Sequence, residues 1–156
     1  MIRVCFVCLG NICRSPAAEG VFEHLVKQEG LEGSIQIDSA GTSSSHVGEK
    51  ADRRMRNHAI RRGYELKSLS RQFIAADFEK FDYIVVMDDS NYSNVMRLDH
   101  NDLYSNKVYK MVDFCTKMKP KEVPDPYYGG EQGFETVLDI VEDASHGLLQ
   151  VIKKEL

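Results

Sequence analysis

The segment I-R-V-C-F-V-C-L-G-N-I-C-R-S-P, from Ile2 to Pro16, contains three successive patterns that decide the fold. Ile2 to Val7 is a short apolar run without alternation, which is typical of a strand buried on both faces of a parallel sheet. The residues from Cys8 to Ser15 include a glycine and an asparagine and predict a loop. Ser15-Pro16 indicates the start of a helix, because proline is favoured at the first helical position.

The rest of the chain continues to alternate between short apolar runs and segments with helical spacing. We predict further strands at Ile35–Asp38, Tyr83–Met87 and Lys107–Val112, and further helices at Glu49–Arg62, Ser90–Leu98 and Phe134–Ile152. This alternation is typical of an α/β fold with helices on both faces of a parallel sheet. Ligands of such folds bind beyond the carboxyl ends of the strands, which is where the Cys8–Ser15 loop is expected. We expect residues 1–156 to form a single domain.

Composition and charge argue against several classes of protein. The chain is 42% hydrophobic and 28% charged, as in ordinary globular proteins, and its longest apolar runs are too short to cross a membrane. A net charge of −4 gives no indication of nucleic-acid binding. Three of the four cysteines crowd into the first strand and loop, unlike a disulfide framework. We therefore expect reduced thiols and a cytoplasmic protein.

Charged residues are unevenly distributed along the chain. A basic run extends from Lys50 to Arg71, and an acidic run extends from Glu122 to Asp143. Both runs are typical of solvated helix faces. The alternative is that the basic run forms a rim that attracts phosphorylated substrates.

The loop pairs Cys8 with an arginine six positions later, Arg14. Successive backbone N–H groups at the start of a helix form a nest for a phosphate, and the Arg14 guanidinium can hold two phosphate oxygens. Gly10 and Asn11 are the residue types that permit a positive φ. These cationic surroundings favour the thiolate of Cys8, which is a good nucleophile. Ser15 either donates a hydrogen bond to this sulfur or caps the helix.

Other functions of the cysteines are weighed against this one. Cys5 and Cys8 form a C-x-x-C motif, but a redox dithiol requires a helix near its first cysteine, and Cys5 is expected inside the strand. Zinc binding requires clustered ligands, and the five histidines show no ligand spacing. We expect Cys5 and Cys115 to be core thiols.

The segment P-D-P-Y-Y-G-G, from Pro124 to Gly130, carries a candidate acid. Prolines on both sides hold Asp125 on a stiff, extended backbone. A mechanism through a phospho-cysteine requires a proton for the departing oxygen, which Asp125 could supply. A turn aspartate is the alternative interpretation. Tyr127 and Tyr128 form either the walls of an aromatic slot or an ordinary pair of tyrosines.

Four segments together resemble the low-molecular-weight protein tyrosine phosphatases. They are V-C-L-G-N-I-C-R-S-P-A-A-E from Val7 to Glu19, D-S-A-G-T from Asp38 to Thr42, M-D-D-S-N from Met87 to Asn91, and D-P-Y-Y-G from Asp125 to Gly129. The resemblance covers nearly the whole chain. It implies a three-layer α/β/α fold with a four-stranded parallel sheet and a phosphate-binding loop between the first strand and first helix. It implies hydrolysis of phosphotyrosine in proteins or peptides, without a metal or organic cofactor.

The resemblance also implies a role for each matching residue. Cys8 would be the nucleophile, Arg14 the ligand of the phosphate and transition state, and Asp125 the general acid. Phosphate or other oxyanions would bind a loop made of Leu9, Gly10, Asn11, Ile12, Cys13, Arg14 and Ser15. The remaining roles are support of the loop by Asn11, Ser15 and Ser39, a substrate crevice at Ile12, Tyr127 and Tyr128, and a reversible pairing of Cys13 with the nucleophile.

The sequence departs from the family pattern at two places. Many members have an aromatic residue just before the position of His46, where this chain has Ser43-Ser44-Ser45. Well-studied members have a histidine in the loop-bracing network where this chain has Ser68. We therefore expect a more open crevice wall and a retuned loop.

Three alternative functions remain. Arginine phosphatases resemble this chain but have threonine at the position of Ile12. An arsenate reductase shares the fold and loop type but requires further cysteines, and downstream of the loop this chain has only Cys115. A non-catalytic phosphate-binding module would not need both Cys8 and Asp125.

Overall fold

Four parallel strands form the central sheet of the computed structural model, which describes all 156 residues. The strands are β1 (Ile2–Cys8), β2 (Ile35–Gly41), β3 (Tyr83–Val86) and β4 (Val108–Lys110). Their order across the sheet is β2-β1-β3-β4, so β1 lies in the interior between β2 and β3. The predicted parallel sheet of four strands is thereby confirmed.

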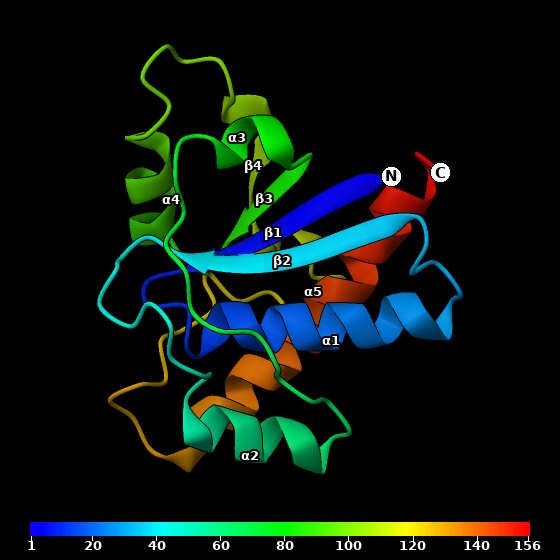
Figure 1. The fold of residues 1–156 in the computed structure, drawn as a ribbon. Coiled ribbons are helices and arrows are strands. Elements are labelled where there is room, and N and C mark those ends of the chain that lie inside the picture. The colour runs from blue at the N-terminus through cyan, green and yellow to red at the C-terminus, as the bar shows by residue number, and fades with distance from the viewer.

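Helices cover both faces of this sheet, which confirms the predicted three layers (Figure 1). The helices are α1 (Arg14–Gln28), α2 (Arg53–Arg61), α3 (Asp77–Lys80), α4 (Asp89–Met96) and α5 (Glu131–Lys153). Two short 3-10 helices flank β4, at Ser105–Lys107 and Met111–Phe114. Figure 1 shows α1, α2 and α5 on one side of the sheet and α3 and α4 on the other.

Alternate side chains of β1 enter the two hydrophobic cores on either face of the sheet. Val4, Phe6 and Cys8 belong to the larger core under α1 and α5, whereas Cys5 and Val7 belong to the smaller one under α3 and α4. Because both faces are buried, the strand has no need of polar positions, which explains its continuous apolar run. Cys5 and Cys8 therefore point to opposite faces, an arrangement unsuited to a C-x-x-C dithiol.

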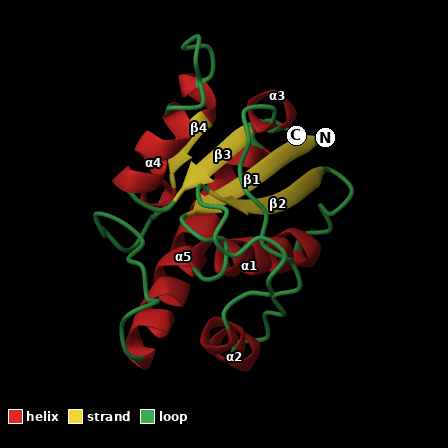
Figure 2. Cartoon of the chain, turned by 60° about the vertical axis from the view of Figure 1, so that its left-hand side comes forward, coloured by secondary structure: helices red, strands yellow, loops and turns green.

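The register of the sheet brings the functional loops to one edge. β1 and β2 pair in parallel from Ile2 opposite Ile35 to Cys8 opposite Gly41, so both strands end at the same level. The loops that follow the strands gather at this edge (Figure 2). The Cys8–Ser15 loop thus lies beyond the carboxyl ends of the strands, as predicted.

Several element boundaries differ from the predictions. Helix α2 begins at Arg53 instead of Glu49, because the Asp52 carboxylate caps it by accepting hydrogen bonds from the backbone of Arg54 and Met55. Strand β4 ends at Lys110, where the chain turns into a 3-10 helix. Helix α3 and the 3-10 helix before β4 are too short to have a visible period in the sequence.

The basic and acidic runs contact each other between α2 and α5. The guanidinium of Arg62 lies 2.7 Å from Glu135, 2.9 Å from Asp139 and 2.7 Å from Glu142. Hydrogen bonds from Arg62 and then His58 lower the pKa of Glu135. These four side chains are 23% to 52% exposed, so they remain at the surface, and their opposite charges in addition join the two helices.

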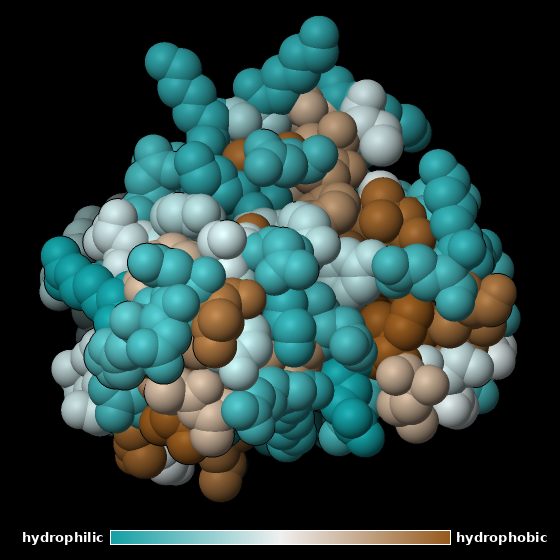
Figure 3. Space-filling view, turned by 90° about the horizontal axis from the view of Figure 1, so that it is seen from above, coloured by the Kyte–Doolittle hydropathy of each residue, from teal (hydrophilic) through white to brown (hydrophobic).

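The surface mixes polar and apolar side chains. Seen from above, hydrophilic groups predominate, with hydrophobic atoms in patches between them (Figure 3). Exposed apolar atoms of this kind are normal for folded proteins. None of the helices has the length and apolar character required to span a bilayer.

Candidate active site

A cavity of about 330 Å³ lies at the carboxyl edge of the sheet, and it brings the two motifs from opposite ends of the chain together. Its lining residues are Cys8, Leu9, Gly10, Ile12, Cys13, Arg14, Ser43, Ser45, His46, Asp125, Tyr127 and Tyr128. Cys8 and Arg14 are each only 2% exposed, so both form the floor. Every residue that the sequence assigned to catalysis or to the crevice lines this cavity.

The loop between β1 and α1 reverses direction at Asn11, which has a φ of +55°. Asparagine is among the few residue types other than glycine that tolerate this left-handed conformation. The expectation of a positive φ is confirmed for Asn11 but wrong for Gly10, which is not among the residues with positive φ. The lack of a side chain at Gly10 instead leaves space for His46, since a Cβ at Gly10 would lie 3.0 Å from the His46 ring.

A glycine on the neighbouring strand makes room for this loop. A Cβ on Gly41 would lie 2.7 Å from the Leu9 carbonyl oxygen and 3.0 Å from the Asn11 backbone nitrogen. Contacts this short do not occur with real side chains, so the loop requires glycine here. In the sequence, Gly41 stands out only as part of the segment D-S-A-G-T, which does not reveal this role.

The Cys8 sulfur contacts the first turn of α1. Cys8 Sγ and Ser15 Oγ are 3.0 Å apart, and both residues are buried. Ser15 lies inside the helix, because the N-cap position belongs to Cys13, whose side chain makes no capping hydrogen bond. The sequence predicts two roles for Ser15, a hydrogen bond to the Cys8 sulfur and the helix N-cap. Ser15 makes the sulfur contact, and it is not the N-cap. Ser15 belongs to the first turn of α1, where the backbone amides have no partner within the helix, so the sulfur lies at the positive end of the helix dipole.

The Asn11 side chain joins three segments behind the loop. Its amide nitrogen donates to Ser15 Oγ at 2.8 Å and to Ser39 Oγ at 2.9 Å. Its oxygen accepts from the backbone nitrogen of Arg71 at 3.0 Å. The three residues predicted to support the loop are thus in direct contact.

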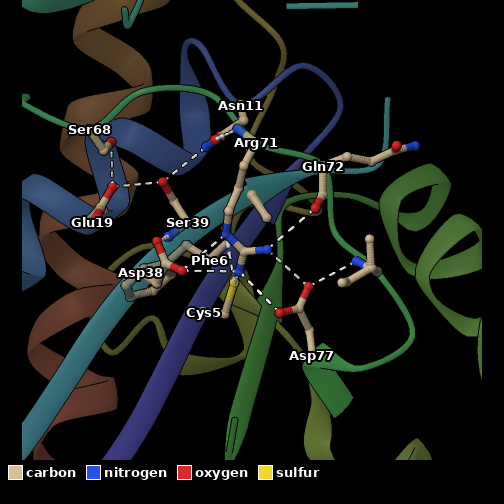
Figure 4. A network of polar contacts seen from close by, with 12 residues as sticks. Cys5, Phe6, Asn11, Glu19, Asp38, Ser39, Ser68, Arg71, Gln72 and Asp77 are labelled. Atoms are coloured by element: carbon tan, nitrogen blue, oxygen red, sulfur yellow. Dashed lines mark hydrogen bonds and ion pairs between the residues drawn. The ribbon is translucent and has the colours of Figure 1, made fainter. Parts of the chain in front are cut away.

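Glu19 closes this network, and sequence reasoning missed it. One carboxylate oxygen of Glu19 accepts from Ser39 Oγ at 2.6 Å and from Ser68 Oγ at 2.7 Å (Figure 4). Burial raises the pKa of Glu19, while the two serine hydroxyls act in the opposite direction. Ser68 therefore takes part in the network even though it is not the histidine that related proteins have. The only sequence signal for Glu19 was its place at the end of the first motif.

Arg71 ties the same network to the sheet. Its guanidinium lies 3.0 Å from Asp38 on β2 and 3.0 Å from Asp77 on α3 (Figure 4). The Arg71 backbone thus reaches the loop through Asn11 while its side chain is held by two carboxylates. The residues that support the loop on the side away from the cavity are therefore far from it in the sequence.

Arg14 is fixed in the floor by a carboxylate that sequence reasoning did not select, Asp88. Arg14 Nη1 donates to Asp88 Oδ2 at 2.6 Å and to the Val123 carbonyl at 3.0 Å. Arg14 Nη2 lies 3.7 Å from Asp125 Oδ2. Burial lowers the pKa of Arg14, but Cys8 and Asp88 together raise it above its usual value. The guanidinium is therefore a permanent, oriented cation at the centre of the cavity.

Asp125 lies at the rim, opposite the loop. Its side chain is 38% exposed, and its Oδ1 accepts from the Tyr127 backbone nitrogen at 3.1 Å. This hydrogen bond forms an Asx turn, which agrees with the interpretation of Asp125 as a turn residue. The other carboxylate oxygen, Oδ2, faces Arg14. Asp125 is thus a turn residue whose second carboxylate oxygen lies beside the Arg14 guanidinium.

Aromatic rings border the cavity next to Asp125. The rings of Tyr127 and Tyr128 meet edge to face with centroids 4.9 Å apart, and Tyr128 is 93% exposed. The His46 ring lies 6.2 Å from that of Tyr127 and occupies part of the wall that Ser43-Ser44-Ser45 were expected to leave open. His46 therefore contributes to this wall together with Ser43 and Ser45, and the wall more open than in related proteins stays a prediction.

The four cysteines are free thiols in different surroundings. Cys13 is buried in the loop, and burial raises its pKa. Burial raises the pKa of Cys5 well above its usual value and that of Cys115 to about 11. These shifts favour protonated, unreactive thiols at Cys5 and Cys115, in agreement with their predicted roles.

Substitutions of Asn11 separate its backbone role from its hydrogen bonds. Both Asn11→Gly and Asn11→Ala remove the amide contacts, but only alanine adds strain at a left-handed φ. We expect Asn11→Ala to be less stable than Asn11→Gly by about 1 kcal/mol. Urea unfolding monitored by circular dichroism measures both variants. Equal stabilities, or a less stable glycine variant, would contradict the assigned backbone strain.

Comparison with known proteins agrees with this geometry. Residues 3–156 match the family model described as low molecular weight phosphotyrosine protein phosphatase. A Synechocystis relative, whose name places it among the low molecular weight protein-tyrosine-phosphatases, is 49% identical over 155 residues, or 99% of each chain.

Solved structures give the same result. A protein tyrosine phosphatase from Entamoeba histolytica has a TM-score of 0.96 with 48% identity, covering 99% of both chains. A Drosophila arginine phosphatase has a TM-score of 0.90 with 30% identity, covering 97% of this chain and 98% of that chain. The loop, the sheet and the match over nearly all residues establish that this chain belongs to the low molecular weight phosphotyrosine protein phosphatase family of hydrolases.

Proposed function

We propose that the protein hydrolyses phosphotyrosine in proteins or peptides through a phospho-cysteine at Cys8. The observation that carries this proposal is the position of three groups in one cavity. A buried sulfur and a buried guanidinium form its floor, and a carboxyl group lies at the rim 3.7 Å from that guanidinium. This arrangement supports in-line attack on a phosphate, with the nucleophile below and the acid on the leaving-group side.

In the first step the phosphate binds to the loop amides and Arg14. The Cys8 thiolate attacks phosphorus, a sulfur–phosphorus bond forms, and the bond to the tyrosine oxygen breaks. Asp125 donates its proton to this departing oxygen, which leaves as a neutral phenol. Arg14, already oriented by Asp88 and Val123, stabilises the charge on the transferring group.

In the second step water attacks the phospho-cysteine. The Asp125 carboxylate accepts a proton from this water, phosphate forms, and the sulfur leaves as a thiolate. The Ser15 hydroxyl, 3.0 Å from the sulfur, supports the thiolate by a hydrogen bond. Inorganic phosphate remains as the oxyanion in the loop until it dissociates.

The cavity walls favour an aromatic substrate group. Ile12 presents an apolar side chain where arginine phosphatases have threonine, and Tyr127 provides an aromatic face. Arginine also stacks on tyrosine, and one solved relative is an arginine phosphatase, so phosphoarginine is the alternative substrate. Arsenate reduction would need a further thiol at the site besides those of the loop, Cys8 and Cys13. The remaining candidate downstream, Cys115, packs near the Ile140 carbonyl of α5, outside the lining of the cavity.

Free cysteines suit a reducing compartment, so we propose the cytoplasm as the location.

Substitution at Cys8 and Arg14 tests the covalent mechanism. Cys8→Ser should still bind vanadate, because the loop amides and Arg14 remain, but kcat should fall by about three orders of magnitude or more. Arg14→Lys should also be severely impaired, since an ammonium cannot reproduce the planar two-point contact. Steady-state kinetics with phosphotyrosine and vanadate titration measure both effects. Substantial turnover by Cys8→Ser would remove the proposed nucleophile.

The substrate class is tested by comparing matched peptides. We expect a far higher kcat/KM for a phosphotyrosine peptide than for phosphoserine, phosphothreonine or phosphoarginine peptides of the same sequence. Ile12→Thr should shift the preference towards phosphoarginine. A phosphoarginine preference in the parent protein would overturn the proposed substrate.

Reversible oxidation is proposed for the two cysteines of the loop. Peroxide would convert the Cys8 thiolate to a sulfenic acid, releasing hydroxide, and the Cys13 thiol would then attack this sulfur, forming a disulfide and releasing water. Peroxide should therefore inactivate the enzyme until dithiothreitol reduces the disulfide, and Cys13→Ser should recover less activity. Full recovery of Cys13→Ser would leave Cys13 with a packing role alone.

A further inference from the structure

Five hydrogen bonds, which link four successive pairs of residues, connect the phosphate-binding loop to Asp125. The Asp52 backbone nitrogen donates to the Ile12 carbonyl at 2.7 Å. The Asp52 carboxylate accepts from Arg54 Nε at 3.2 Å and from Arg54 Nη2 at 3.0 Å. Arg54 Nη2 also donates to the Tyr127 carbonyl at 3.0 Å, and the Tyr127 nitrogen donates to Asp125 Oδ1 at 3.1 Å.

Both backbone groups of Tyr127, its N–H and its carbonyl, take part in this series of hydrogen bonds. Its N–H orients the Asp125 carboxyl group, and its carbonyl is held by Arg54. Movement of Tyr127 therefore changes the direction in which Asp125 points. Since Asp125 is 38% exposed and lies on a loop, this contact is one of few that fix it.

Arg54 is itself held on several sides. Its guanidinium carbon lies 4.9 Å from the centre of the Phe134 ring on α5 and 5.5 Å from that of Tyr127. Asp52, its ionic partner, is fixed as the N-cap of α2 by the backbone nitrogens of Arg54 at 2.8 Å and Met55 at 3.3 Å. The guanidinium thus has one defined orientation between α2, α5 and the Asp125 loop.

We infer that Arg54, oriented by Asp52, is a positioning residue that places Asp125 over the phosphate-binding loop for proton transfer. This inference rests on the proposed role of Asp125 as the general acid. In the sequence, Arg54 is one residue of the basic run from Lys50 to Arg71. Its position two residues after Asp52 and its contact with the opposite end of the chain give it this separate role.

The expected effect is on geometry more than on stability. The Arg54 side chain is 44% exposed, and ion pairs at such exposed positions contribute little to stability. A general acid must instead lie within about 2.6–3.2 Å of the oxygen that it protonates, and a misplacement of about 1 Å can slow a reaction by about 10²-fold. Loss of Arg54 should therefore impair proton donation while the fold persists.

Two substrates with different leaving groups separate proton donation from the rest of catalysis. Phosphotyrosine requires the proton, whereas an aryl phosphate with a strongly acidic phenol hardly does. We compare kcat/KM, which reports formation of the phospho-cysteine and excludes its hydrolysis, a step that both substrates share. We expect Arg54→Ala to lower kcat/KM for phosphotyrosine by about 10-fold and for the acidic aryl phosphate by less than about 2-fold. The alkaline limb of its pH–rate profile should also weaken, because the rate depends less on a protonated acid.

The neighbouring Arg53 provides the matched control. It carries the same charge on the same turn of α2, is exposed, and makes no side-chain hydrogen bond or ion pair. Arg53→Ala should retain the parent rates on both substrates. Asp52→Asn provides a second variant, since asparagine caps the helix equally well but lacks the charge that orients Arg54. It should show the same substrate-selective loss, smaller in size.

The decisive comparison adds Arg54→Ala to Asp125→Asn. With the acid already removed, Arg54→Ala should cause no further loss that depends on the leaving group. A further loss, or identical behaviour of Arg54→Ala and Arg53→Ala with an unchanged melting temperature, would overturn the positioning role. If Arg54→Ala unfolds, the same criterion applies to Asp52→Asn. If Asp125→Asn itself lowers kcat/KM of both substrates equally, the proposed acid fails, and the inference falls with it for that separate reason.

Discussion

The left-handed backbone at Asn11 turns the chain back towards α1, and the side chain of the same residue holds the turn in place. Its amide bridges Ser15 and Ser39, and its oxygen receives the Arg71 backbone. The close approach that results is possible because Gly41 has no Cβ. These contacts place Cys8 beside the start of the helix, so the environment of the sulfur depends on a conformation that few residue types adopt.

The rest of the site follows from where the parallel strands end. Arg14 on α1 is oriented by Asp88, which follows β3, and by Val123, which precedes the Asp125 loop. A short buried ion pair of this kind orients the Arg14 guanidinium but adds little to the stability of the fold, because desolvation offsets much of its Coulomb attraction. At the outer rim of the cavity, Arg54 orients the Asp125 loop in a similar way, through the Tyr127 carbonyl. Positions remote in sequence are thereby fixed relative to one sulfur.

Sequence reasoning predicted the parts of the fold and site whose signals are local. The apolar run of β1, the proline at the start of α1 and the prolines around Asp125 each act on their immediate neighbours. Glu19, Asp88 and Arg54 were missed because their roles arise from contacts with residues 20 to 74 positions away. Their charges are ordinary in the sequence, and only the folded chain gives each of them a partner.

The opposite charge runs illustrate the same limit from the other side. Their composition alone favoured solvated faces, but Arg62 unites three carboxylates of α5. His46 likewise entered the crevice from a segment whose serines predicted an open wall. A linear pattern reports what a residue can do, whereas its neighbours in the fold decide which of these possibilities is realised.

The most direct test of the account is to trap the reaction intermediate. Rapid acid quenching of the Asp125→Asn variant during turnover of phosphotyrosine, followed by proteolysis and mass spectrometry, would locate any phosphoryl group on the chain. The account predicts one phosphoryl group on the peptide that contains Cys8, and none when Cys8 is also replaced by serine. Phosphate release without a modified Cys8, or a phosphoryl group on another residue, would contradict it.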